Sequence, residues 1–369
     1  MNSKIDGALP VRSLEARYYI DPLVFENEMQ GLLSRTWQFA GHKTQLSEVG
    51  DYFSFEIAGQ NLFAIHGQDG VIRTFYNVCQ HRAHELVSGT GNTRVVVCPY
   101  HAWSYELTGQ LRAGPNIKSV PGLDRSAICL TEVRTEDFHG FLFVNLDPDT
   151  RPMDEWFPNV RDELAAFVPE IDCLAPLEWV EVKENCNWKV SVENYSECYH
   201  CHLNHPTFAN GVVKPETYDI QPDAGGGYVL RHTTECQSLE AMTYPIDLGA
   251  NDHAGDYQSW FLWPTFSFQC YPGNVLNTYH WRVDDVNSCA VWRGWYTEGG
   301  KDSAVIRKLA IQDRETTVAE DIGLVESVQR GMRSKGYRPG PLVLDPKSGV
   351  NSEHSIQKLH QWVREALDG

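Results

Sequence analysis

The stretches NVCQHRAH (residues 77–84) and VCPYHAWSYELTGQL (residues 97–111) decide the fold that this sequence predicts. Each holds a cysteine followed two or three residues later by a histidine, and sixteen residues separate His81 from Cys98. Short runs rich in β-branched and aromatic residues surround them and predict strands. These runs are residues 51–57, 61–67, 71–78, 93–100 and 139–146. We therefore expect a small all-β unit whose loops bring two thiols and two imidazoles together.

This donor set suits two kinds of metal group. Two thiolates and two imidazoles can hold Zn²⁺, or a [2Fe–2S] cluster with both cysteines on one iron and both histidines on the other. A zinc ribbon normally uses two Cys-x-x-Cys pairs, so the spacing favours the cluster. Neutral imidazoles raise the reduction potential of such a cluster above that of an all-cysteine one. The remaining alternative makes Cys79 and Cys98 ordinary core residues.

A second group of ligand-type residues occupies ECYHCHLNH (residues 197–205). Residues 186–203 predict a helix that closes near Pro206, because proline discourages continuation. On this helix Glu197 and His200 share a face, and His205 can join them only if the helix ends between the histidines. Two histidines and one carboxylate form the facial triad of non-haem Fe(II) sites. A Cys-x-x-Cys pair at residues 198–201 leaves a redox or zinc site as an alternative.

The rest of the chain predicts helices and strands of a larger unit. Residues 14–37 favour a helix that starts at Asp21-Pro22, and residues 153–168 favour another. Strand character returns over residues 257–297, and two helices over 316–332 and 352–367 finish the chain. The simplest organisation is a β-rich unit inserted in an α+β unit.

Composition excludes several classes of function. The net charge of −18, from 49 acidic and 31 basic residues, disfavours nucleic acid as a partner. No apolar run is long enough to cross a membrane and no signal peptide is evident, so we expect a cytoplasmic protein. In that compartment the ten cysteines should not form a disulfide framework, and most should be buried small hydrophobes.

The sequence around both ligand groups resembles the terminal (alpha) subunits of Rieske non-haem iron oxygenases. The resemblance runs from YYIDP (residues 18–22) through the last helix. It implies an α+β fold, with an all-β Rieske domain inserted in a larger catalytic domain whose antiparallel sheet is flanked by helices. We expect residues 1–40 to form an N-terminal helical segment of the catalytic domain, 41–150 the Rieske domain and 151–369 the mononuclear iron domain. The resemblance assigns four ligands to the [2Fe–2S] cluster: Cys79, His81, Cys98 and His101.

The resemblance also implies a mononuclear Fe(II) bound by His200 and His205. Glu197 would connect the cluster of one subunit to the iron of its neighbour. Most family members have aspartate here, so Glu197 keeps the carboxylate and lengthens its reach by one methylene. This departure points to the branch that holds carnitine monooxygenases. Asn194 is expected to border the iron site.

The third iron ligand is expected in VAEDIGLVESVQRG (residues 318–331). The family context favours Asp321 over Glu320, while Asp313 and Glu315 are the remaining candidates. A solvated helix start would explain these charges without a metal.

The implied reaction needs partners. The resemblance implies that a separate flavin and iron–sulfur reductase draws electrons from NAD(P)H. No Gly-rich dinucleotide motif follows a strand, so we expect that this chain does not take hydride itself. Electrons would pass from His101 through Glu197 to His200 across a subunit boundary in a homotrimer. The Fe(II) would then use O₂ to insert one oxygen atom into a substrate.

Aromatic residues crowd WFLWPTFSFQCYPGNVLNTYHWR (residues 260–282). Aromatic faces can cage a quaternary ammonium, although about half of these residues must face away from any pocket. The residues expected to line the pocket are Tyr195, Phe268, Tyr271 and Tyr279. The resemblance favours a trimethylammonium substrate, above all L-carnitine, cleaved to trimethylamine and malic semialdehyde.

Other substrates and roles stay open. N-demethylation of glycine betaine, stachydrine or a related betaine is one alternative. Hydroxylation of an aromatic acid is another, because Arg282 or Arg293 could bind a carboxylate. A Rieske electron carrier fused to an inert binding domain, or a structural zinc protein, would be no oxygenase at all.

Overall fold

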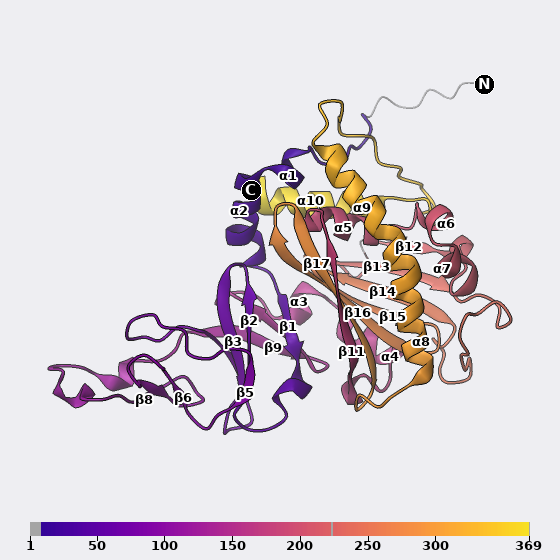
Figure 1. The fold of residues 1–369 in the computed structure, drawn as a ribbon. Coiled ribbons are helices and arrows are strands. Elements are labelled where there is room, and N and C mark those ends of the chain that lie inside the picture. The colour runs from indigo at the N-terminus through magenta and orange to yellow at the C-terminus, as the bar shows by residue number, and fades with distance from the viewer. Residues whose placement is uncertain (1–8, 223, 369) are drawn as a thin grey trace, which may run out of the picture. The chain divides into compact units, whose positions relative to one another are not determined.

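The computed structural model describes residues 9–222 and 224–368, which fall into two compact units (Figure 1). The larger unit combines residues 1–28 with 154–369, and the smaller unit is residues 29–153. The boundaries between the units fall at residues 28/29 and 153/154, whereas the sequence predicts them at 40/41 and 150/151. The smaller unit is thus inserted in the sequence of the larger one, and its sheets together with the antiparallel sheet and helices of the larger unit confirm the predicted fold class.

The smaller unit is built from short antiparallel strands. They are β1 (Gln38–His42), β2 (Asp51–Ile57), β3 (Gln60–His66), β4 (Ile72–Tyr76), β5 (Thr90–Asn92), β6 (Val96–Val97), β7 (Ser104–Tyr105), β8 (Leu111–Ala113), β9 (Glu132–Phe138) and β10 (Phe141–Asn145). Seven of them form a sheet in the order β1-β10-β9-β4-β3-β2-β5, and β6-β7-β8 form a second sheet. The predicted strand over 93–100 shortens to the two residues of β6, because the chain turns immediately afterwards.

The larger unit contains one antiparallel sheet of seven strands. They are β11 (Leu174–Glu184), β12 (Asp219–Gln221), β13 (Val229–Glu235), β14 (Asp256–Leu262), β15 (Phe266–Tyr271), β16 (Val275–Asp285) and β17 (Ser288–Glu298). Their order is β11-β17-β16-β15-β14-β13-β12, so every neighbour except β11–β17 follows directly in sequence. The strands β14 to β17 fill the region in which strand character was predicted, and their residues are mostly buried.

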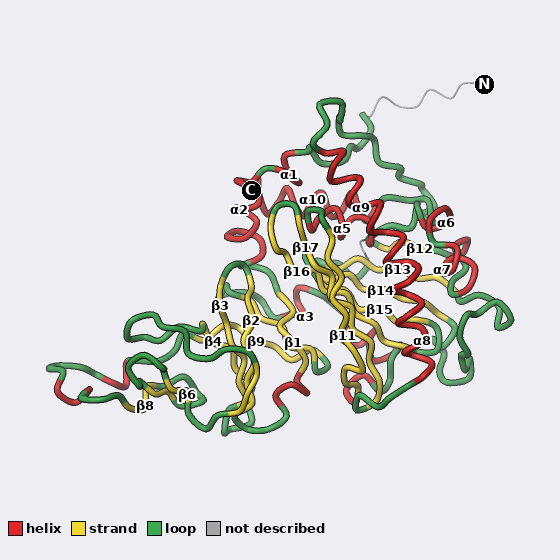
Figure 2. The backbone as a smooth tube through the Cα atoms, viewed as in Figure 1, coloured by secondary structure: helices red, strands yellow, loops and turns green. Residues whose placement is uncertain are grey.

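Helices of the larger unit cover this sheet, and short helical segments also occur in the smaller unit (Figure 2). The α-helices are α1 (Arg17–Ile20), α2 (Pro22–Asn27), α3 (Met153–Trp156), α4 (Val160–Phe167), α5 (Trp188–Tyr195), α6 (Cys201–Asn204), α7 (Pro206–Gly211), α8 (Ala304–Asp313), α9 (Ala319–Met332) and α10 (His354–Asp368). Two π-helical segments are η1 (Glu28–Leu33) and η7 (Arg314–Val318), and the 3-10 turns are η2 (Lys43–Leu46), η3 (Ile117–Ser119), η4 (Arg125–Ala127), η5 (Ile171–Cys173) and η6 (Pro215–Thr217). Helix α5 contacts both β16 and α9, so it lies between the sheet and the C-terminal helices.

Two predicted helices are interrupted. The helix expected over 153–168 breaks into α3 and α4 at Pro158, where Asn159 adopts a left-handed conformation (φ 67°). The helix expected over 186–203 ends at Tyr195, and Pro206 begins α7 instead of closing it. Proline is well tolerated in the first turn of a helix, because the N–H that it lacks would have no helical partner there.

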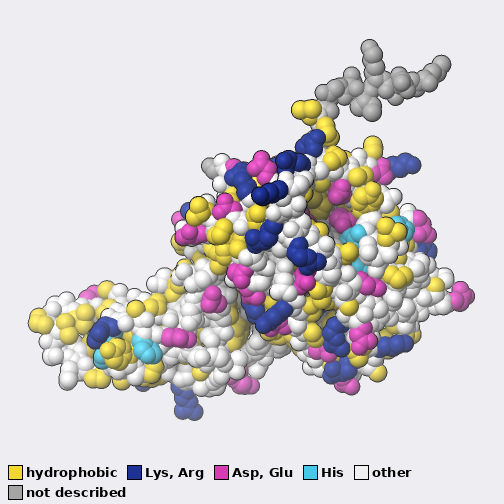
Figure 3. Space-filling model, turned by 45° about the horizontal axis from the view of Figure 1, so that its top comes forward, with side chains coloured by type: hydrophobic (Ala, Val, Ile, Leu, Met, Phe, Trp, Pro, Cys, Tyr) yellow, Lys and Arg dark blue, Asp and Glu magenta, His cyan; other side chains and the backbone are white. Residues whose placement is uncertain are grey.

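The C-terminal helices also differ from expectation. Helix α9 matches the predicted run over 316–332 but continues a longer helical stretch, since α8 and η7 precede it directly. Helix α10 begins at His354, and Ser352 Oγ forms a hydrogen bond of 2.5 Å with His354 Nδ1. No helix in the described part of the chain is long and apolar enough to cross a membrane. Acidic and basic side chains are interspersed on the face shown in Figure 3.

A fully buried ion pair anchors the start of the larger unit to α5. Lys189 Nζ lies 2.5 Å from Glu28 Oε1, and the Trp188 indole donates to Glu28 Oε2 at 2.9 Å. We expect Lys189→Met to reduce the free energy of unfolding by about 3–5 kcal/mol, because it leaves the Glu28 carboxylate buried without its charge partner. Urea unfolding measures this loss.

The exposed pair between Lys301 and Glu298 provides the control. Lys301→Met should change the free energy of unfolding by less than about 1 kcal/mol, as is typical of surface pairs. Equal effects of the two substitutions would contradict a structural role for the Lys189 pair.

Candidate metal centres

The loops around Cys79 and Cys98 have the same backbone design. In each loop the N–H four residues after the cysteine donates to the cysteine carbonyl at 3.0 Å. The cysteine N–H in turn donates to the carbonyl five residues on, at 2.8 Å in the first loop and 2.7 Å in the second. The fourth residue is an alanine in both, with left-handed φ values of 57° at Ala83 and 55° at Ala102. This design turns the chain tightly and presents each histidine beside its cysteine.

The side chains of these loops fit a [2Fe–2S] cluster. Cys79 and Cys98 are buried free thiols, and the rings of His81 and His101 lie 4.6 Å apart between centroids. His101 Nδ1 is buried and has no hydrogen-bond partner among the described residues. A buried ring nitrogen without a partner is costly unless a ligand uses it, so this atom suits an iron–imidazole bond.

Two neighbouring aromatic residues were missed by the sequence reasoning. Trp103 stacks on His81, with ring centroids 4.6 Å apart and planes 9° apart. Tyr105 Oη lies 3.2 Å from Cys79 Sγ and accepts the Gln80 N–H at 3.0 Å. Because the Tyr105 oxygen accepts from Gln80, its own proton is free to point at the sulfur. The period-2 pattern that starts at Trp103 is the only sequence signal for these contacts.

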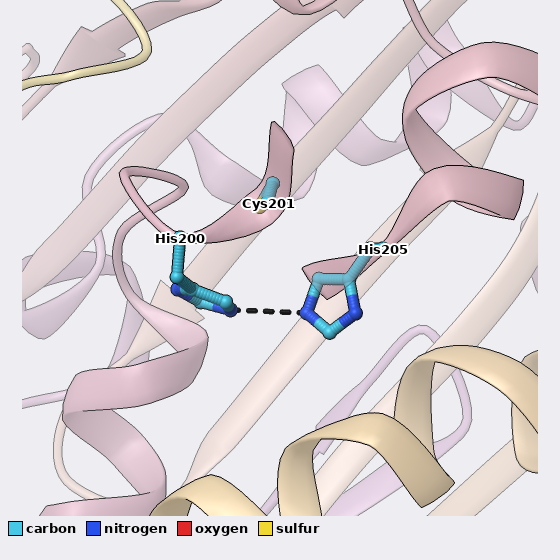
Figure 4. A group of neighbouring side chains, drawn as sticks. All are labelled: His200, Cys201 and His205. Atoms are coloured by element: carbon cyan, nitrogen blue, oxygen red, sulfur yellow. Dashed lines mark hydrogen bonds between the residues drawn. The ribbon is translucent and has the colours of Figure 1, made fainter. Parts of the chain in front are cut away.

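Three side chains from separate elements converge in the larger unit. His200 Nε2 and His205 Nε2 lie 3.0 Å apart (Figure 4). Asp321 Oδ1, in the first turn of α9, lies 3.4 Å from the first nitrogen and 3.1 Å from the second. Helix α6 stands between the two histidines and turns both rings toward α9. Three ligand-type atoms this close fit a two-histidine, one-carboxylate iron site with open positions.

The other ring nitrogen of each histidine is held by a carboxylate. His200 Nδ1 lies 2.5 Å from Glu197 Oε1, and His205 Nδ1 lies 2.9 Å from Glu320 Oε2. Such contacts fix the ring orientation and leave Nε2 free for a metal. The structure therefore brings Glu320 and Asp321 to the same site with different contacts. Asp313 lies elsewhere, paired with Arg293.

The carboxylates favour positive charge at this point. Burial lowers the pKa of His200, but its hydrogen bonds to Asp321 and Glu197 outweigh burial and raise that pKa to about 10. Burial raises the pKa of Asp321, yet the hydrogen bonds to His200 and His205 hold it at about 2. A site that stabilises the charged forms this strongly also suits a metal cation, whose binding would release the histidine protons.

The segment that carries Glu197 is a turn, which corrects the helical geometry expected for it. Residues 196–200 lie outside any helix, and Glu197 Oε2 accepts the Tyr199 N–H. The contact with His200 therefore arises within a turn and not from neighbouring positions on a helix. Asn194, at the end of α5, places Nδ2 3.4 Å from His200 Nε2 and so borders the site.

One cysteine pair differs from the expectation of free thiols. Cys198 and Cys201 form a disulfide, while the other eight cysteines are free. Both members are buried and pack against Tyr218 and Ile220. The close spacing that suggested a redox or zinc pair thus links two residues beside the histidine site.

A cavity of about 650 Å³, including its opening to solvent, adjoins these histidines. Its lining includes the site residues, the polar side chains of Gln269 and Arg293, and many aromatic side chains, among them Tyr195, Phe208, Tyr218, Tyr257, Tyr271, Tyr279 and Trp281. Phe268 does not line this cavity, which corrects the expectation for it. It lies on the opposite face of β15 from Gln269 and Tyr271, and its ring packs 4.8 Å from that of Phe266.

Rieske-type loops and a centre of two histidines and one aspartate, present in one chain, define an iron-dependent oxygenase of the Rieske class. The chain belongs to the ring-hydroxylating alpha-subunit family: the description "Ring hydroxylating alpha subunit (catalytic domain)" matches residues 171–369, and "Rieske [2Fe-2S] domain" matches residues 36–124. It is an oxidoreductase that uses a [2Fe–2S] cluster and a mononuclear iron.

The chain is also similar to individual oxygenases whose names state a substrate. The chain is 31% identical to the carnitine monooxygenase oxygenase subunit of Escherichia coli K12, over 96% of this chain and 94% of the relative. It is 27% identical to the chloroplastic choline monooxygenase of Spinacia oleracea, over 95% of this chain and 77% of the relative. A solved quaternary ammonium Rieske monooxygenase, CntA in complex with L-carnitine, superposes with a TM-score of 0.84 at 28% identity, covering 97% of this chain and 96% of that one.

Proposed function

We propose that this chain is the terminal oxygenase of a two-component monooxygenase that hydroxylates a quaternary trimethylammonium compound, most of all L-carnitine. The observation that carries the proposal is the tyrosine-rich cavity that reaches the two-histidine, one-aspartate centre. Aromatic faces attract quaternary ammonium groups by about 0.5–2 kcal/mol per favourable contact. Similarity to carnitine monooxygenase subunits over nearly the whole chain supports the same choice.

The site residues have distinct roles in this proposal. His200, His205 and Asp321 hold the mononuclear iron, which supplies O₂ activation when bound. Glu197 and Glu320 orient the two imidazoles, and the aromatic walls hold the substrate with water largely excluded. Cys79, His81, Cys98 and His101 hold the cluster in the smaller unit.

The proposed reaction balances with two electrons and two protons. One oxygen atom of O₂ enters the C–H bond beside the nitrogen, and the other leaves as water. The hydroxylated carbon then forms an aldehyde as its C–N bond breaks and the nitrogen keeps the electron pair. L-Carnitine would give trimethylamine and malic semialdehyde.

The electrons come from a separate flavin and iron–sulfur reductase that oxidises NAD(P)H. We infer that they pass from His101 through Glu197 to His200 across a subunit boundary in a homotrimer, and that the protein is cytoplasmic. The contact of 2.5 Å between Glu197 and His200 supports the last step of this route. Inter-subunit electron transfer in the solved quaternary ammonium monooxygenase supports the oligomer.

N-demethylation of a betaine is the second candidate. A glycine betaine monooxygenase oxygenase subunit of Chromohalobacter salexigens is 34% identical over 56% of this chain. This activity would release formaldehyde and a demethylated amine from the same cavity. The product assay therefore separates the two candidates.

The test is substrate-dependent NADH consumption with a reconstituted reductase. L-Carnitine, glycine betaine, stachydrine, choline and benzoate are compared, and trimethylamine and formaldehyde are both assayed. We expect L-carnitine to give the fastest coupled turnover with trimethylamine as product. Turnover of benzoate alone, with no quaternary amine oxidised, would overturn the proposal.

The Tyr105 contact predicts an effect on the cluster. Tyr105→Phe should lower its reduction potential, because the hydroxyl donor at 3.2 Å from Cys79 stabilises the more negative reduced state. One such hydrogen bond contributes about 1 kcal/mol, which corresponds to about 40 mV for a one-electron couple. A redox titration followed by visible absorption measures the shift. Tyr100→Phe, at an exposed neighbour, is the control, and an equal shift in both variants would refute the hydrogen bond to sulfur.

A further inference from the structure

Two buried N–H donors in the cavity wall have no acceptor within the described part of the chain. Gln269 is 1% exposed and Arg293 is 6% exposed, and both line the cavity. Among the described residues, neither Gln269 Nε2 nor Arg293 Nε has a hydrogen-bond partner. Buried donors are nearly always paired, so two unpaired donors in one cavity indicate a ligand that accepts hydrogen bonds.

The surrounding residues fix both groups in place. Tyr257 donates its hydroxyl proton to Gln269 Oε1 at 2.8 Å, which directs the amide nitrogen away from that tyrosine. Arg293 Nη1 lies 2.6 Å from Asp313 Oδ2, and the guanidinium stacks 3.8 Å from the centroid of Tyr279. Asp313 therefore neutralises one edge of the guanidinium and leaves Nε for another acceptor.

This donor pair is set apart from the metal centre along the C-terminal helices. Asp313, which holds Arg293, precedes Asp321 by eight residues in the continuous run from α8 through η7 to α9. The two positions are therefore about two helical turns, roughly 10 Å, apart along this run. The metal end carries the carboxylates of Glu197 and Asp321, which favour a cation, whereas at the other end the carboxylate of Asp313 is already paired with Arg293 and two donors are left without an acceptor among the described residues.

We propose that Gln269 Nε2 and Arg293 Nε bind the carboxylate of a zwitterionic substrate and hold its ammonium end toward the metal centre. This inference rests on the proposed function and deepens it. It selects carboxylated trimethylammonium compounds over choline, whose neutral hydroxyl is a weaker acceptor than a carboxylate. It also explains why a buried arginine stands in a cavity for a cation: Arg293 recognises the opposite end of the substrate.

The test compares L-carnitine with its methyl ester, in which an added methyl group removes the carboxylate charge. Gln269→Glu keeps the acceptor for Tyr257 but replaces the free donor with an acceptor. We expect kcat/KM for L-carnitine to fall about 10- to 100-fold, mainly through KM, and kcat/KM for the ester to change less than about 3-fold. Gln269→Met, which is neutral and lacks the donor, should shift the preference in the same direction.

A matched control uses another buried glutamine. Gln258 donates to the Ser259 carbonyl at 3.1 Å and does not line the cavity. Gln258→Glu should leave the ratio of the two kcat/KM values unchanged, and the cluster spectrum and iron content establish that each variant is folded.

The outcomes separate the inference from the proposed function. If the wild-type protein oxidises carnitine and its ester equally, or if Gln269→Glu weakens both alike, the carboxylate site is refuted while the function stands. A rotation of the Gln269 amide onto Asn277, its cross-strand neighbour with an unpaired Oδ1, would give that result. If only an acid without an ammonium group is oxidised and Gln269→Glu abolishes this activity, the carboxylate site holds and the proposed function fails.

Discussion

His205→Ala is expected to abolish product formation, by at least about a thousandfold, while the protein keeps its Rieske cluster. His205 Nε2 lies within 3.1 Å of both His200 Nε2 and Asp321 Oδ1, so its loss removes one of three ligand atoms. The iron content should fall from about three to about two per chain, since the cluster supplies two and the second centre one. Iron analysis, the visible spectrum and product assays measure the three effects.

His202 provides the control, because it is an exposed histidine three residues away. His202→Ala should retain about three irons and near-normal turnover. If His205→Ala continued to form product, the larger unit would not hold the catalytic iron. The electron-carrier alternative would then account better for the chain.

Glu197→Gln is expected to uncouple the two centres without removing either. The amide keeps the shape of the side chain but removes the charge that accepts the His200 Nδ1 proton at 2.5 Å. The reductase should still reduce the cluster, but its reoxidation with substrate and O₂ should slow at least 10- to 100-fold. Stopped-flow absorption of the cluster measures this rate. Glu197→Asp should recover part of it, because the carboxylate returns with a shorter reach.

Glu320→Gln is the matched control. Glu320 Oε2 lies 2.9 Å from His205 Nδ1, so it orients His205 in the way that Glu197 orients His200. It is not on the proposed electron route, so once the variant is fully loaded with iron, its cluster should reoxidise at the normal rate. Equal slowing in both variants would mean that Glu197 acts only on metal binding.

The Rieske loops were predictable because their determinants are local. Each cysteine and histidine lie within one tight turn, and the flanking strands follow the period-2 pattern in sequence. The strand expected over 51–57 coincides with β2, which places the first sheet correctly. The stacking of Trp103 on His81 was not predictable, since it depends on how two separate loops approach each other.

For the candidate iron site, the sequence identified which side chains converge but did not reveal the backbone that carries them. The residue types identified His200 and His205 as candidates, the family resemblance singled out Asp321, and the structure brings the ligand atoms of all three together. Helical propensity did not reveal that α5 stops at Tyr195, because a turn held by Glu197 and a disulfide replaces the helix there. The placement of Glu320 behind His205 likewise depends on tertiary packing.

Which side chains of a strand line the cavity could not be predicted without knowing the register of that strand. Tyr271 and Tyr279 line it as predicted, whereas Phe268 faces the other side of the sheet. A shift of one residue reverses every side chain of a strand, and β15 is buried on both faces, so burial alone does not tell which face lines the cavity. The pairing of Arg293 with Asp313 joins a strand to the end of a helix, so it depends on tertiary packing that the sequence alone did not reveal.

A single-turnover experiment tests the central claim, that both metal centres of this chain act together on a quaternary amine. The protein is fully reduced, separated from its reductase and mixed with O₂ and L-carnitine. We predict that trimethylamine forms, up to about one equivalent per mononuclear iron, as the cluster is oxidised at the same rate. Oxidation of the cluster without any product from L-carnitine or the other quaternary amines would contradict the account.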